Sequence, residues 1–291
     1  MQASIRVIVL WLVVGCILVV HSQAVEPAAK MKIVLVAGEI TKVDKLGHHD
    51  YPGGIEALRV LLSSIPDVET VSILDGWPKE TSQLDHAACV VFYTDGGGKQ
   101  AFLQSRERIE SLQRLVDQGT GLVMIHQAVD FPAEFALQAK SWIGGIYLAE
   151  HSGRGHWPSK HVDFPRHEVT RGVSPWEIND GWLNQIVFVD GLQGVVPLVW
   201  SGKQYAGSRA GLDNDIVAWA YERPRGGRSF CFTGLDAHSA WAIPGVRQLV
   251  LNGTLWAAGS HIPESGAPCE IGEQTLLDMQ TPREAKQSVQ P

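Results

Sequence analysis

The first half of the chain alternates short apolar runs with segments of helical periodicity. Four runs have the length and β-branched content of strands buried on both faces. They cover residues 32–37, 68–74, 88–94 and 121–125. Residues 54–64 and 104–118 place apolar side chains every three or four positions, which predicts amphipathic helices. Strands alternating with helices predict a parallel sheet with helices on both faces.

The second half adds further strands and a closing helix. Apolar runs predict strands over 185–189, 195–200, 215–221 and 228–233. The last two are joined by Pro224-Arg225-Gly226-Gly227, a hairpin signal. Residues 244–258 predict a helix, whereas 263–291 are polar and predict a flexible tail. We therefore expect one α/β domain over 31–262.

The predicted core consists of apolar residues on the strands. Seven of them are expected to be buried: Val34, Val36, Val91, Val123, Ile125, Phe230 and Phe232. Few apolar residues lie beyond Ser265, so removal of the tail is expected to leave thermal stability nearly unchanged.

Residues 1–24 have the pattern of a secretory signal peptide. Arg6 supplies the positive start, residues 7–20 the apolar core, and Ser22-Gln23-Ala24 a small-x-small cleavage site. The core is shorter than the roughly 20 residues of a transmembrane span. The sequence thus favours an exported chain without a membrane anchor after cleavage. A lipoprotein modified at Cys16 is the weaker alternative, because the apolar run continues past it.

Composition excludes several classes of function. The formal net charge is −7 and no basic stripe is present, so nucleic acid is not expected as a partner. Cys89 and Cys231 lie within apolar runs, and the cysteine spacing indicates neither a zinc ribbon nor a disulfide framework. No Gly-x-Gly-x-x-Gly or Walker pattern supports nucleotide binding.

Candidate chemistry gathers where strands end. His126 directly follows the central strand, His49 lies in the loop after the first, Asp95 follows the third, and His238 follows the last. Because the carboxyl ends of parallel strands share one edge of a sheet, these groups are expected to meet in one cleft. Gly97, in the loop after the third strand, could offer backbone N–H groups to sugar hydroxyls.

A polar and aromatic stretch over 147–161 is predicted to be a functional loop. It carries Glu150, His151, His156 and Trp157. Tryptophan is a frequent stacking surface in sugar sites. Trp182 and Trp241 are further candidates for that role.

These residues leave two kinds of chemistry open. Convergent histidines and carboxylates suit general acid–base catalysis or a divalent metal, but no His-Glu-x-x-His motif specifies a metal. No Gly-x-Ser-x-Gly motif supports a serine hydrolase. No cofactor is therefore assigned.

Several motifs resemble the ThuA-like (trehalose-utilisation) family. They occupy residues 124–130, 142–145, 167–172, 178–180, 217–228, 232–238 and 251–259. The family's fold is that of class I glutamine amidotransferases without their catalytic cysteine, and here His126 stands at that position. The resemblance implies a three-layer, mostly parallel α/β sheet of flavodoxin-like or class I glutamine amidotransferase-like type.

The chain departs from the family pattern in two places. Family members tend to have Asp-Glu followed by an aromatic residue where this chain reads Asn179-Asp180-Gly181-Trp182. Near the last strand, Gly-His is common where this chain has Leu235-Asp236.

The resemblance implies bacterial sugar catabolism, with oxidised (3-keto) glycosides or related small sugars as substrates. We expect His126 and His238 to face each other as acid and base, with Asp180 orienting one of them. The expected substrate-binding residues are His49, Asp95, Gly97, Asp130, Glu150, His151, His156, Trp157, Trp182 and Trp241. The alternatives are a non-catalytic sugar-binding module using Trp157, Trp182 and Trp241, or an accessory subunit.

The leader predicts a mature N-terminus at Val25, because cleavage follows the small residue Ala24. Mass spectrometry of the protein from its native source checks this. An intact Met1 would contradict export by this route, and a lipid on Cys16 would favour the lipoprotein alternative.

Overall fold

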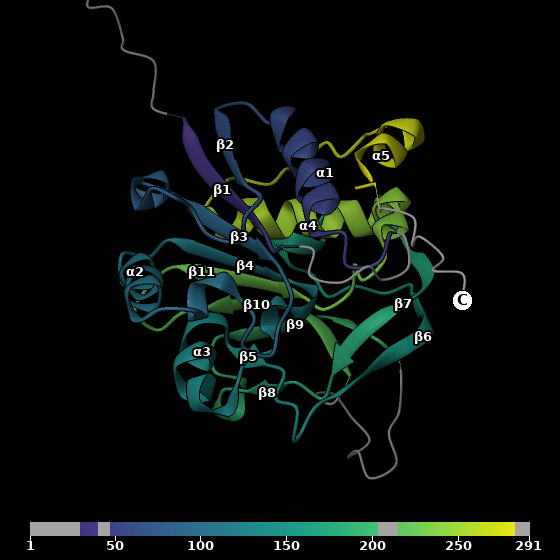
Figure 1. The fold of residues 1–291 in the computed structure, drawn as a ribbon. Helices are drawn as coiled ribbons and strands as arrows, with labels where there is room; N and C mark the ends of the chain where they lie inside the picture. Colours follow the sequence, from purple (N-terminus) through teal and green to yellow (C-terminus); the bar gives the residue numbers. More distant parts are fainter. Residues whose placement is uncertain (1–29, 40–46, 203–214, 283–291) are drawn as a thin grey trace, which may run out of the picture.

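A seven-stranded sheet forms the centre of the part of the chain that the structure describes. The computed structural model describes residues 30–39, 47–202 and 215–282. The strand order is β2-β1-β3-β4-β11-β10-β9 (Figure 1). The strands are β1 (Met31–Ala37), β2 (Val68–Ile73), β3 (Cys89–Tyr93), β4 (Gly121–Ile125), β9 (Val195–Trp200), β10 (Ile216–Glu222) and β11 (Arg228–Phe232). The first five strands in that order are parallel, and β10 is antiparallel to both neighbours. This confirms the expected mostly parallel α/β fold.

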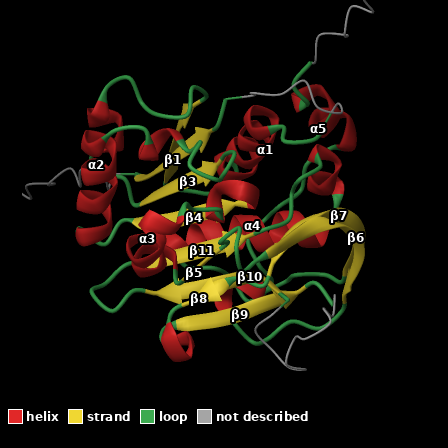
Figure 2. Cartoon of the chain, turned by 60° about the horizontal axis from the view of Figure 1, so that its bottom comes forward, coloured by secondary structure: helices red, strands yellow, loops and turns green. Residues whose placement is uncertain are grey.

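Four helices cover the two faces of the sheet (Figure 2). They are α1 (Tyr51–Ser63), α2 (Arg106–Asp117), α3 (Ala136–Ile143) and α4 (Pro244–Ala257). Helices α1 and α4 pack on one face, whereas α2 and α3 pack on the other. Successive side chains of a strand point to opposite faces of the sheet. Strands of the sheet therefore contribute apolar side chains to the hydrophobic core on each face. The seven core residues expected from sequence are all buried.

Local capping explains where the two predicted helices begin. Asp50 caps α1 by accepting a hydrogen bond from the backbone N–H of Gly53 at 3.2 Å. Ser105 caps α2 in the same way, accepting from the N–H of Arg108 at 3.3 Å. Short 3₁₀ turns complete the connections: η1 (Thr81–Leu84), η2 (Ala101–Leu103), η3 (His126–Val129), η4 (Ala133–Phe135), η5 (Glu168–Thr170), η6 (Asp190–Leu192) and η7 (His238–Ala242).

The stretch expected to be a functional loop is largely an antiparallel ribbon. Strand β6 (Gly153–His161) pairs along its whole length with β7 (Trp176–Asn184). Trp157, Ser159 and His161 alternate inward along β6, which is the period of a half-buried strand. A smaller ribbon joins β5 (Gly145–Ile146) to β8 (Val187–Phe188).

The segment after α4 is not a loose tail over its described part, contrary to expectation. Helix α5 (Glu273–Met279) places Leu276 in the core beside α1, with only 3% of Leu276 exposed. Arg247 of α4 donates to the carbonyl of Cys269 at 3.1 Å, and Gln248 donates to that of Ala267 at 2.8 Å. Polar anchoring of the backbone thus fixes a segment whose composition indicates a tail.

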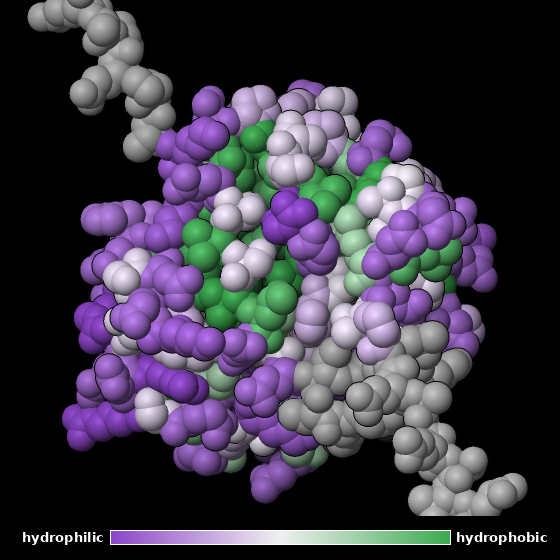
Figure 3. Space-filling model, turned by 45° about the horizontal axis from the view of Figure 1, so that its top comes forward, coloured by the Kyte–Doolittle hydropathy of each residue, from purple (hydrophilic) through white to green (hydrophobic). Residues whose placement is uncertain are grey.

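The described residues include no helix long and apolar enough to cross a bilayer. The face seen in Figure 3 mixes hydrophilic residues with a hydrophobic area that they surround.

Two adjacent leucines test whether α5 contributes to stability. Leu276→Ala should lower the free energy of unfolding by about 2–4 kcal/mol, because it leaves a cavity in the core. Leu277→Ala is the matched control, since Leu277 is 54% exposed, and should change stability by less than about 0.5 kcal/mol. Equal effects in a urea titration would show that α5 is not packed as described.

Candidate functional site

Four histidine side chains surround the carboxylate of Asp236. Its Oδ2 lies 2.7 Å from His48 Nδ1 and 2.8 Å from His156 Nε2. Its Oδ1 lies 2.8 Å from His49 Nε2 and 3.2 Å from His126 Nε2. We call these five residues the Asp236 cluster.

The sheet brings the cluster together from four segments of the chain. His126 follows β4, and Asp236 follows the neighbouring strand β11, so both reach the same edge. His48 and His49 precede α1, where the backbone N–H of His49 donates to the carbonyl of Asp236 at 2.9 Å. His156 enters from β6.

Backbone conformations in the cluster are unusual. His49, His126 and Leu235 have φ values of 49°, 56° and 68°, in the left-handed region that residues with a Cβ rarely adopt. His126 therefore makes a sharp turn between strand and helix and projects its ring from the sheet edge. Such strain concentrates at functional sites, where surrounding contacts enforce it.

Asp180 of β7 holds the backbone on both sides of Asp236. Its Oδ2 accepts from the N–H of Leu235 at 2.7 Å, and its Oδ1 accepts from Ala237 at 3.2 Å and from Gly181 at 2.9 Å. Burial raises the pKa of Asp180, and the nearby His126 and these N–H groups oppose that rise. Asp180 is thus a positioning residue for the Asp236 loop.

Gly181 makes room for the carboxylate. A Cβ at position 181 would lie 2.7 Å from the Cβ of Asp236, closer than real Cβ atoms approach. The segment around Gly181 and the loop that carries Asp236 therefore lie in direct contact.

Asp236 is ionised in this setting. Burial by itself would raise the pKa of the carboxyl group, but the imidazoles of His126, His49 and His156 outweigh burial and hold the pKa well below its usual range. A fixed anion among imidazoles can orient them and stabilise an imidazolium formed during proton transfer.

The cluster also has the ligand types of a metal site. His49, His126 and Asp236 form one trio, and His48, His156 and Asp236 form another. In each trio the ligand atoms lie within 4.8 Å of one another. Imidazole and carboxylate are common ligands of zinc and other divalent transition metals.

His238, expected to face His126, is held elsewhere. Its Nε2 lies 2.8 Å from the carbonyl oxygen of Leu276, and its Nδ1 lies 3.3 Å from Asp50 Oδ2. The ring joins α5 to the start of α1, so the expected acid–base pairing of His126 with His238 does not fit this arrangement. Asp236, two residues earlier, is the side chain that enters the cluster.

The three expected stacking tryptophans are core residues. Trp182 and Trp241 are 1% and 0% exposed, and Trp157 is 8% exposed. Trp182 donates to the carbonyl of Trp157 at 3.1 Å and packs edge-on against Phe232. Their rings are covered by protein and offer no stacking surface for a sugar.

Other expected binding residues are not members of the cluster. Asp95 accepts from the Tyr51 hydroxyl at 2.5 Å and lies 3.4 Å from Lys99 Nζ. It lines a hollow of about 440 Å³ at the ends of β1 and β3. Gly97 donates its N–H to the carbonyl of Asp130 at 2.8 Å. Glu150 and His151 are exposed in the turn before β6.

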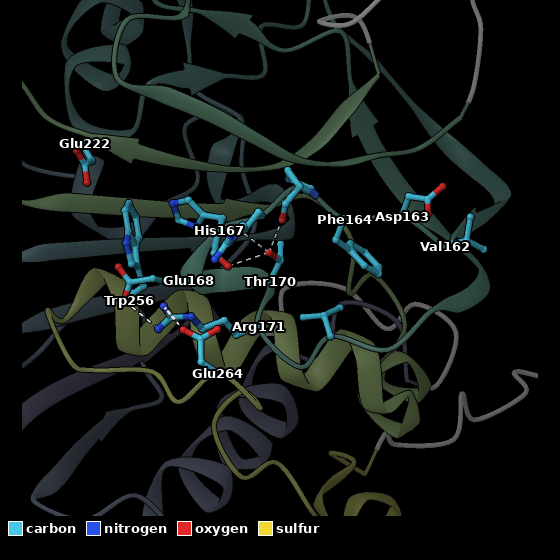
Figure 4. A pocket seen from close by; sticks show the side chains of 13 residues that line it. Val162, Asp163, Phe164, His167, Glu168, Thr170, Arg171, Glu222, Trp256 and Glu264 are labelled. Carbon is cyan, nitrogen blue, oxygen red and sulfur yellow. Dashed lines mark hydrogen bonds and ion pairs between the residues drawn. The ribbon is translucent and has the colours of Figure 1, made fainter.

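A second hollow, of about 700 Å³, lies between 162–173 and the end of α4 (Figure 4). Its polar groups bind one another. Arg171 pairs with Glu264 at 2.8 Å, and His167 accepts the N–H of Val169 at 3.1 Å. Asn252 of α4 donates to the carbonyls of Val169 at 3.0 Å and Arg171 at 2.8 Å. These two bonds tie the segment to α4, which favours a structural role.

Two members of the Asp236 cluster were missed from sequence. His48 adjoins the predicted His49. Asp236 follows the last strand as His238 does, so the expectation that residues after strand ends meet at one sheet edge (the strand-end rule) applies to both. Position alone could not show which of Asp236 and His238 points into the cleft.

The family model for trehalose utilisation, ThuA, matches residues 34–257, most of the chain. The chain belongs to the ThuA family. This confirms the resemblance inferred from sequence, and the family's description indicates a role in carbohydrate utilisation.

Solved ThuA-like structures share the fold. A ThuA-like protein from Bacteroides uniformis ATCC 8492 has a TM-score of 0.58 at 12% identity, covering 84% of this chain and 98% of that one. One from Parabacteroides merdae ATCC 43184 has a TM-score of 0.53 at 14% identity, covering 80% and 92%. No curated protein matches this chain.

The raised pKa of Asp130 can be tested through the pH dependence of stability. Burial raises the pKa of Asp130 to about 6, although Arg154, 3.6 Å away, and Lys99 oppose the rise. Because the folded-state pKa exceeds the ordinary 3.8, the charged form disfavours folding and the contribution of Asp130 to stability falls as pH rises through that window. The stability gain of Asp130→Asn over wild type should therefore grow between pH 4 and 6 and then level off.

Thermal melts of both proteins across pH 4–8 measure that difference. A constant difference, or one that shrinks with rising pH, would show that the Asp130 carboxyl has an ordinary pKa.

Proposed function

We propose that this ThuA-family chain is an exported protein of carbohydrate catabolism that catalyses proton transfer on oxidised (3-keto) glycosides or related sugars. The observation that carries the proposal is the Asp236 cluster, four imidazoles around one ionised carboxylate. The leader over residues 1–24, which lies outside the described residues, supports export from sequence alone.

The cluster suits substrates that carry a ketone. A carbonyl acidifies the C–H bonds beside it, so a base of near-neutral pKa can remove such a proton and later return it. Imidazole has an ordinary pKa of about 6.5 and suits both steps. The His156 side chain is 59% exposed, whereas that of His126 is 3% exposed. His156 is therefore the group we assign to contact the sugar.

Asp236 and its supports have the complementary role. The carboxylate accepts N–H bonds from His48 and His156 and compensates the positive charge that develops when one of the imidazoles takes a proton. Asp180 keeps the carboxylate in place through the N–H groups of Leu235 and Ala237.

A non-catalytic sugar-binding module is the less favoured alternative. It relied on Trp157, Trp182 and Trp241 as stacking surfaces, and all three are buried. A cluster of titratable groups around a buried anion is also more than sugar binding requires.

Incubation with disaccharides and their 3-keto forms, followed by mass spectrometry and by proton exchange from D₂O, tests the proposal. We expect conversion or exchange with 3-keto forms and little with the parent sugars. Asp236→Asn should reduce the rate by about 10²–10⁴-fold, the usual scale for disrupted acid–base catalysis.

The control is Asp85→Asn, which removes the charge of an exposed aspartate before β3 and should leave the rate unchanged. Absence of any reaction or exchange across the panel, with the protein folded, would overturn the proposal and favour the binding or accessory alternatives.

A further inference from the structure

We propose that His49, His126 and Asp236 bind one divalent transition-metal ion. The inference deepens the proposed function, on which its catalytic meaning rests, but the binding is measured without any sugar. The donors would be the Nε2 atoms of both histidines and Oδ1 of Asp236.

The spacing of the three donors is close to that of a metal site. Oδ1 lies 2.8 Å from His49 Nε2 and 3.2 Å from His126 Nε2. Ligand atoms about 2.0–2.1 Å from a tetrahedral zinc ion lie roughly 3.3 Å apart. Both distances to Oδ1 are therefore within about half an ångström of the tetrahedral value, and the donor atoms of the trio all lie within 4.8 Å of one another.

The hydrogen bonding of His126 supplies an independent argument. Its Nδ1 lies 3.0 Å from the carbonyl oxygen of Thr233. A carbonyl can only accept, so Nδ1 carries a proton and donates it. In the neutral ring, Nε2 then has a lone pair, and this lone pair faces Oδ1 of Asp236, a carboxylate oxygen that also carries lone pairs.

Two lone pairs facing each other at 3.2 Å repel unless a positive charge lies between them or on the ring. Nε2 of His126 is buried and has no hydrogen bond of acceptable geometry. A bound cation satisfies both atoms at once. Donation of the remote ring N–H to a backbone carbonyl is also the usual support of a metal-binding histidine.

His48 and His156 complete the support of the carboxylate. Both contact the other oxygen, Oδ2, at 2.7 and 2.8 Å. They hold Asp236 in the orientation that directs Oδ1 toward His49 and His126. The side chain of His156 is 59% exposed, against 3% for that of His126, so we assign the ion to the more buried trio.

The donor set indicates the class of ion and its use. Two imidazoles and one carboxylate suit zinc and related divalent metals. Three protein ligands leave a position for water or substrate, as in catalytic sites. A ketone oxygen bound there would be polarised, which favours removal of the neighbouring proton.

Zinc titration of the EDTA-treated full-length mature chain tests the inference. Isothermal titration calorimetry should give one Zn²⁺ per chain, and Co²⁺ substitution should give a visible absorption spectrum of a low-coordinate site. His126→Ala and His49→Gln should each weaken binding by at least about 100-fold. His156→Ala, which removes a supporting residue, should weaken it by about 10-fold.

The control variant is His86→Ala, because His86 is exposed at the turn before β3, and it should bind zinc as wild type does. Circular dichroism shows whether each variant is folded. If His126→Ala does not fold, His49→Gln still tests the contribution of the trio to zinc binding.

Three results would overturn the inference: no stoichiometric binding at 10 µM zinc, unchanged affinity in folded His49→Gln, or loss of binding in His156→Ala with retention in His126→Ala. Turnover of 3-keto sugars in EDTA would separate the two proposals, since the proposed function would stand without the metal. Tight zinc binding without turnover would support the metal site and contradict the proposed function.

Discussion

The ionised carboxylate of Asp236, about 98% buried, is the constraint on which the site depends. Removing a carboxylate from water costs several kcal/mol unless hydrogen bonds and opposite charge compensate it. Here four imidazoles lie 2.7–3.2 Å from the two carboxylate oxygens, and those of His48 and His156 supply hydrogen bonds. The histidines reach Asp236 from three parts of the fold: His48 and His49 from the turn before α1, His126 from the end of β4, and His156 from β6. The sheet edge, the start of α1 and the β6–β7 ribbon are thereby fixed relative to one another.

The loop that carries Asp236 is itself held by polar contacts. Asp180 binds the N–H groups of Leu235 and Ala237, and the Tyr93 hydroxyl donates to the carbonyl of Leu235. Gly181 allows the close approach, since a Cβ there would meet that of Asp236. The β7 segment around Asp180 and the loop that carries Asp236 are thus in direct contact.

Periodicity predicted the fold well, because a strand buried on both faces appears in the sequence as a continuous apolar run, and an amphipathic helix appears as apolar residues every three or four positions. The strand-end rule likewise located His49 and His126 correctly at the shared sheet edge. It could not choose between Asp236 and His238, because the chain leaves the extended conformation at Leu235, whose φ is 68°, and side-chain direction then depends on that turn. Tryptophan content could not separate core from surface, and the composition of 263–282 could not reveal that Arg247 and Gln248 anchor its backbone.

The arrangement around Asp236 is tested most directly by long-range ¹H–¹⁵N NMR of the imidazoles in ¹⁵N-histidine-labelled protein, comparing wild type with Asp236→Asn. The structure predicts that the resonances of His48, His49, His126 and His156, assigned by single substitutions, change together. Those of His161 should be unaffected, because its buried ring contacts Ser159 and Trp176 instead. Unchanged resonances of the four histidines in folded Asp236→Asn would contradict the central claim that this carboxylate organises the site.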